Sequence, residues 1–185
     1  MSGILFAALA VLLLGALLWG FLRVLTTRVR REESSWDDLL ARLAPVGRAG
    51  IQEVAVAFLD PTGSELDSRQ VDRRLDPRDI WDFLGGIEGL KTMRRNAEVL
   101  VDLASYVSRW NPEALVVAEQ LRLDANEIKI AISRIEKAGR RGRLEASFSV
   151  QASRAAAAYY LMTQRVYALY EISQSGLLAE LKAAI

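Results

Sequence analysis

Apolar side chains recur at helical spacing along most of the chain. In the most regular series the steps alternate between four and three residues, which places the side chains on one face of a helix. Its members are Ala114, Ala118, Leu121, Ala125, Ile128, Ile132 and Ile135. Such a face fits a coiled-coil dimer as well as a bundle. Because the chain offers several other helices, packing inside a bundle is the better interpretation.

Two further long helices follow from the same pattern. One has an apolar face at Val99, Leu100, Leu103, Tyr106, Val107 and Trp110. The other extends from about Leu144 to Ser173, with an apolar face at Phe148, Ala152, Ala155, Tyr159, Met162, Val166 and Leu169. Its four consecutive alanines, at 155–158, would let another helix approach closely.

Capping residues and glycines predict where these helices begin and end. Residues 76–77 are Asp-Pro and residues 111–112 are Asn-Pro, and both pairs are typical of helix starts. Gly139 is expected to end the helix that begins near 112. Gly176 is expected to end the last long helix, before a short amphipathic tail.

The shorter segments are predicted from weaker signals. Ser34 or Ser35 can cap a short helix. Residues 47–59 fit a strand and a helix equally well by spacing, but no second strand is visible to pair with them, so we expect a helix. The charged residues 60–76 are expected to form a loop. The predicted fold is therefore all-α, with about three long helices plus short ones.

The N-terminal region differs from the rest. Residues 4–22 form a run of nineteen residues without a charged side chain, roughly 28 Å long as a helix and close to the hydrocarbon thickness of a bilayer. A cleaved signal peptide would need basic residues before the run, and a buried helix would need a larger globule. We therefore expect a transmembrane anchor at 1–25, a basic juxtamembrane linker at 26–34 and a helical domain at 35–185.

Positive charge is distributed unevenly around this run. No Lys or Arg precedes it, whereas Arg23, Arg28, Arg30 and Arg31 follow it. Because positively charged flanks stay in the cytoplasm, we expect the N-terminus outside and the helical domain in the cytoplasm. The four arginines either act only as this topology signal or also bind the headgroups of membrane lipid.

The composition removes most catalytic chemistry. The chain of 185 residues has no cysteine and no histidine, so the commonest general base and the usual soft metal ligands are missing. The net charge of +1 does not favour a nucleic-acid binder. We expect a protein that is not an enzyme and that needs no cofactor or metal.

The stretch WDFLGGIEGLKTMRRNA, residues 81–97, has two features of a phosphate-binding loop, namely clustered glycines and a following Lys91-Thr92. Leu90, however, stands where that loop needs a glycine directly before the lysine, and no strand precedes it. The sequence therefore does not predict a nucleotide site here.

The same glycines also have the spacing of the Gly-x-x-Gly loop that clamps nucleic-acid backbone in KH domains. Glu88 would repel phosphate in that loop, and the strands of that domain are missing. The better interpretation is a corner between two helices at Gly85 and Gly86, because adjacent glycines destabilise a continuous helix.

Three further groups have both a chemical and a structural interpretation. Asp124 and Glu127 share a helix face, but metal sites in bundles also use histidine, so a solvated face is favoured. Four tyrosines of the last long helix serve packing more often than binding. The basic cluster at 134–143 either ends a helix in solvent or touches lipid or nucleic acid.

These expectations combine into one function. We expect a single-pass, membrane-anchored scaffold, adaptor or accessory subunit of a membrane complex, which binds a protein partner or a second copy of itself through its surface. No nucleic acid is expected as a partner. The alternative is a membrane-tethered regulatory module that binds nucleic acid or a small effector through the basic helix end.

Overall fold

The structure of the protein is a computed structural model that describes residues 14–15, 19, 35–59, 75–142, 144–173 and 175–185. The chain divides into two compact units, 1–35 and 36–185, and the second is described below. Apart from residues 14, 15 and 19, the predicted span at 4–22 lies outside the described part of the chain. Arg23, Arg28, Arg30 and Arg31, and most of the predicted loop at 60–76, also lie outside it.

Among the residues that the structure describes, no helix is both long enough and apolar enough to cross a membrane.

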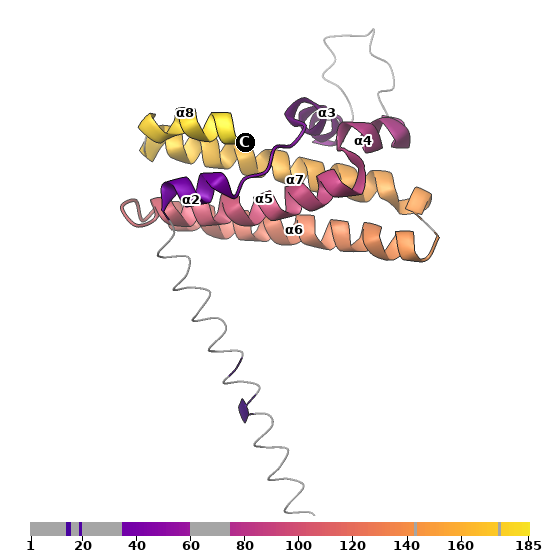
Figure 1. The fold of residues 1–185 in the computed structure, drawn as a ribbon, viewed down its shortest axis with the longest axis horizontal. Coiled ribbons are helices and arrows are strands. Elements are labelled where there is room, and N and C mark those ends of the chain that lie inside the picture. Colours follow the sequence, from indigo (N-terminus) through magenta and orange to yellow (C-terminus); the bar gives the residue numbers. More distant parts are fainter. Residues whose placement is uncertain (1–13, 16–18, 20–34, 60–74, 143, 174) are drawn as a thin grey trace, which may run out of the picture. The chain divides into compact units, whose positions relative to one another are not determined.

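The second unit is all-α, which confirms the predicted class. Residues 48–59, which the spacing left ambiguous, form a helix. In the described part of this unit, three long helices lie beside one another, and four short ones accompany them (Figure 1). In chain order the helices are α2 (Trp36–Ala41), α3 (Arg48–Leu59), α4 (Pro77–Phe83), α5 (Gly86–Val107), α6 (Ala114–Arg140), α7 (Leu144–Ser173) and α8 (Ser175–Ala184).

The core lies between α5, α6 and α7, which pack against one another. The regular apolar series predicted for α6 faces this core, because every member is fully buried except Ala125, which is partly buried. The apolar face that this series forms is therefore buried by other helices of the same chain. Tyr106 and Trp110 are the exceptions on the face predicted for α5, since Tyr106 is partly buried and Trp110 is exposed.

Helix α7 is the central element, and it contacts α3, α4, α5, α6 and α8. The predicted apolar face is buried, but so are five consecutive residues, 155–159, which point in all directions around a helix. Four of the five are alanines, whose small side chains let neighbouring helices pack close on several sides.

The helix start predicted at Asp76-Pro77 is confirmed, whereas α6 begins at Ala114, two residues after the predicted Pro112, and two predicted ends are wrong. Asp76 caps α4 by accepting a hydrogen bond from the Arg78 amide at 2.8 Å. Helix α6 continues past Gly139, and the glycine with positive φ beyond its end is Gly142, at +68°. Gly176 lies inside α8 instead of before it. Where two glycines lie close together near an exposed helix end, the sequence does not show which of them terminates the helix.

Candidate functional site

The glycine corner, residues 84–89, joins α4 to α5. Gly85 and Gly86 have φ values of +67° and +61°, a left-handed conformation that glycine adopts without steric strain. A Cβ on Gly86 would lie 2.8 Å from the ring of Trp81, and a Cβ on Gly89 would overlap the Leu84 carbonyl. The glycines therefore allow both the turn and the close packing of the two helices.

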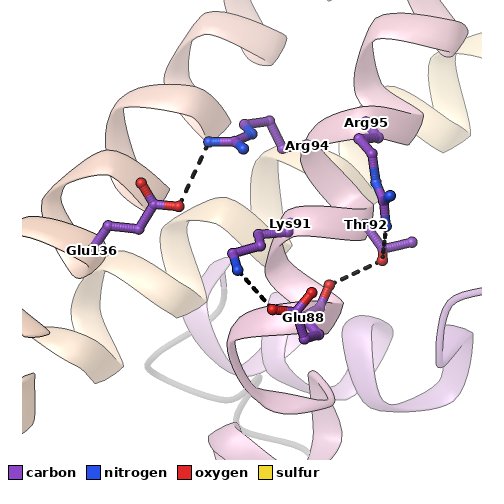
Figure 2. Close-up of polar contacts among 6 residues, drawn as sticks. All are labelled: Glu88, Lys91, Thr92, Arg94, Arg95 and Glu136. Carbon is purple, nitrogen blue, oxygen red and sulfur yellow. Dashed lines mark hydrogen bonds and ion pairs between the residues drawn. The ribbon is translucent and has the colours of Figure 1, made fainter.

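Lys91 and Thr92 lie on α5, and their side chains contact their own helix (Figure 2). The Lys91 ammonium pairs with Glu88 at 2.6 Å, and its hydrogen bond and charge lower the pKa of the Glu88 carboxyl. The Thr92 hydroxyl donates to the Glu88 carbonyl at 2.9 Å and accepts from Arg95 at 3.0 Å. Residues 86–89, which have the Gly-x-x-Gly spacing, form the first turn of α5 and not a loop.

Lys91→Ala should leave the midpoint of urea unfolding unchanged, because an exposed pair within one helix contributes little stability. Neither the parent protein nor Lys91→Ala should bind ATP or GTP. Isothermal titration of both proteins checks this, and saturable binding by the parent protein that is lost in Lys91→Ala would contradict it.

Asn96 connects three parts of the chain through buried hydrogen bonds, which we call the Asn96 clasp. It lies on α5 and is fully buried. Its carboxamide accepts from the Ala44 amide at 3.0 Å and donates to the Ala44 carbonyl at 2.7 Å. It also donates to the hydroxyl of Tyr159 on α7 at 3.3 Å. One side chain thus fixes the α2–α3 connection to the core.

The tyrosines of α7 serve mainly packing. Tyr159 and Tyr170 are buried, and the Tyr170 hydroxyl donates to the Leu103 carbonyl on α5 at 3.0 Å. Tyr160 and Tyr167 are partly buried against the core. Burial raises the pKa of Tyr159 to about 12 and also raises the pKa of Tyr170, because the phenolate form would lose its hydration.

Stability should therefore fall in alkali. The unfolded chain releases a tyrosine proton near pH 10, whereas folded Tyr159 keeps its proton to about pH 12. Between these values the folded state binds more protons, so the free energy of unfolding decreases as pH rises, by about 2–3 kcal/mol for this group. In Tyr159→Phe the free energy of unfolding, measured by urea unfolding across this pH range, should decrease less steeply with pH than in the parent protein. Equal dependence on pH in the two proteins would contradict the assignment.

The outer face of α6 carries a row of exposed apolar side chains. Val116, Leu123 and Ile130 lie seven residues apart, and 63%, 72% and 43% of each residue's surface is exposed. Seven residues are close to two helical turns, so the three side chains share one face. The inner series of the same helix is buried at the core, so this outer row is a second apolar face, which none of the other described helices buries.

Ion pairs connect this face of α6 to α7. Arg154 pairs with Glu127, and Arg165 pairs with Asp124. Burial raises the pKa of the Asp124 carboxyl, and the neighbouring guanidinium offsets only part of that rise. The two carboxylates are thus bridges between helices and not simply a solvated face. In the described residues, no group of three acidic side chains could hold a metal ion.

A groove of about 250 Å³ lies beside the row, between α6 and α7. It is lined by Leu123, Asn126, Glu127, Ile130, Ala131, Arg134, Gln151 and Arg154. Apolar and charged side chains therefore surround one concave surface. We call the row and this groove together the α6 outer face.

The basic cluster continues the α6 outer face toward the end of the helix. Arg134 and Lys137 follow Ile130 by four and seven residues, which keeps both on the same side as the row. Both are exposed, as are Arg140 and Arg141. Sequence reasoning found this cluster but missed the row, although its seven-residue spacing was a visible signal.

No family of known proteins, no curated protein and no solved structure matches this chain.

Proposed function

We propose that the protein is a non-catalytic, membrane-anchored scaffold or adaptor subunit whose helical domain binds another protein. The α6 outer face carries this proposal. Scattered single apolar residues are common on protein surfaces, but a row of three at helical spacing beside a groove is typical of a surface that a partner covers.

The helical domain is suited to present this face in a fixed position. Ion pairs tie α6 to α7, and the Asn96 clasp ties α5 to α7 and to the α2–α3 connection. The Trp36 indole of α2 donates to Glu180 of α8 at 2.8 Å, and its ring lies tilted against the ring of Tyr170 on α7. These contacts hold short and long helices together as one body, which is what an adaptor surface requires.

The anchor is proposed from the sequence of residues 4–22, with the domain on the cytoplasmic side because of Arg23, Arg28, Arg30 and Arg31. In bacterial cells the protein should remain in the membrane fraction after carbonate washing, and deletion of residues 1–25 should release it. A reporter that is active only outside the cytoplasm should be silent when fused after Ile185. A washed-off parent protein or an active reporter would contradict this part of the proposal.

The second candidate function is a tethered module that binds nucleic acid or an anionic effector through the end of α6. Arg134, Lys137, Arg140 and Arg141 favour it, because none of them forms an ion pair within the described residues. Binding to duplex DNA that weakens steeply with salt, and that is lost when these four residues are replaced by alanine, would support it over a protein partner.

A further inference from the structure

The charges of α6 indicate what kind of partner the α6 outer face would bind. Every carboxylate of this helix is already paired with an arginine: Glu119 with Arg122, Asp124 with Arg165, Glu127 with Arg154 and Glu136 with Arg94. Among the cations of α6, only Arg122 forms an ion pair with a residue that the structure describes. The charge that the helix leaves available for a partner is therefore positive.

Two of the available cations, Arg134 and Lys137, lie at one end of the apolar row. The exposed side chains from Val116 to Ile130 are apolar at every seventh residue, and Arg134 and Lys137 then extend the same line. From Val116 to Lys137 the line is about 30 Å long, which is the length of a helix of about 21 residues. A partner that lies along this line would contact apolar side chains over most of its length and positively charged side chains at one end.

We propose that the α6 outer face binds an acidic amphipathic helix of a partner protein, whose apolar side chains pack along Val116, Leu123 and Ile130 and whose carboxylates reach Arg134 and Lys137. This inference deepens the proposed scaffold function and rests on it. Packing supplies the attraction, and the complementary charge selects the partner and its direction along α6.

Other occupants fit the same surface less well. A nucleic acid would match the cations, but it would leave the exposed apolar side chains of Val116, Leu123 and Ile130 without an apolar partner. A concave groove beside the row suits a convex helix more than a flat bilayer. A second copy of this chain brings no carboxylate on α6 that is not already paired.

The test uses the full-length protein in nanodiscs of zwitterionic lipid and two fluorescent peptides of about 21 residues. Both peptides carry leucine along one helical face, and they differ only at one end, which has four glutamates or four lysines. Fluorescence anisotropy should show that the glutamate peptide binds at least about tenfold more tightly. Equal affinity for the two peptides would overturn the proposal.

Four variants locate the binding. Leu123→Ser with Ile130→Ser should weaken binding of the glutamate peptide about tenfold, because two apolar contacts are lost. Arg134→Glu with Lys137→Glu should reverse the preference between the peptides. Two controls should change affinity by less than about twofold: Lys129→Glu, which removes a cation of α6 that lies off the line, and Val56→Ser, which removes an exposed apolar side chain of α3.

Three other outcomes would overturn the inference. The first is equal weakening by a control variant. The second is stronger binding to anionic vesicles than to the glutamate peptide, lost in the same variants. The third is self-association in detergent, measured by light scattering, that Leu123→Ser abolishes. None of these three outcomes contradicts membrane anchoring. Conversely, release of the parent protein from the membrane fraction of cells would contradict the proposed function, but it would not affect this assay with purified protein.

Discussion

Asn96→Leu should lower the free energy of unfolding by about 2–4 kcal/mol, one of the two largest effects that we expect. Leucine fills a similar volume but leaves the amide and carbonyl of Ala44, and the hydroxyl of Tyr159, without the partner that Asn96 supplies. A partly or fully buried polar group that loses its partner costs about 1–3 kcal/mol. Urea unfolding of the full-length protein in mild detergent measures the change.

Hydrogen exchange tests the location of this effect. The Ala44 amide should exchange faster in Asn96→Leu than in the parent protein, because the clasp fixes the α2–α3 connection. Asn126→Leu is the matched control, since Asn126 is an exposed asparagine of α6 and its replacement should change stability little. Equal destabilisation by the two substitutions would show that the clasp does not stabilise the fold.

Gly86→Ala should destabilise the protein by a similar amount, about 2–4 kcal/mol. A left-handed conformation costs a non-glycine residue about 1–2 kcal/mol, and the added methyl group would press on the Trp81 ring, which adds about 1–3 kcal/mol. Thermal unfolding followed by circular dichroism measures the loss.

Gly176→Ala is the control for this prediction. Gly176 lies in α8, and a Cβ there would meet no atom within 4 Å. Alanine should therefore stabilise that helix by up to about 1 kcal/mol through its helix propensity. The two glycine substitutions should thus have opposite signs, and stabilisation by both would show that α4 and α5 can form one continuous helix.

The fold class could be predicted because the apolar series of α5, α6 and α7 are long and regular. The face of α6 at Leu121, Ile128 and Ile132 was visible from spacing alone and is fully buried. The burial of α7 on several sides was not predictable in the same way. It depends on five neighbouring helices, whose positions are set by the assembled fold and not by the α7 sequence.

The candidate site was only partly predictable. The Asn96 clasp was not predicted from the sequence, because the partner of Asn96 is the backbone of Ala44, which is 52 residues away. Asn96 also follows two arginines and looks like an ordinary polar residue of a helix. The basic end of α6 was visible as a cluster, but its surplus of positive charge appears only when the ion pairs of Glu127 and Glu136 with distant arginines are known.

The most direct test of the central claim is photocrosslinking from the α6 outer face inside cells. A photoreactive phenylalanine analogue replaces Leu123 in the full-length protein, and the control replaces Val56, which is also exposed but lies on α3. The scaffold account predicts a discrete protein adduct from position 123 and none from position 56, with the crosslinked peptide of the partner lying in an acidic amphipathic helix. No adduct from position 123, or the same adducts from both positions, would contradict the claim that this face binds a protein partner.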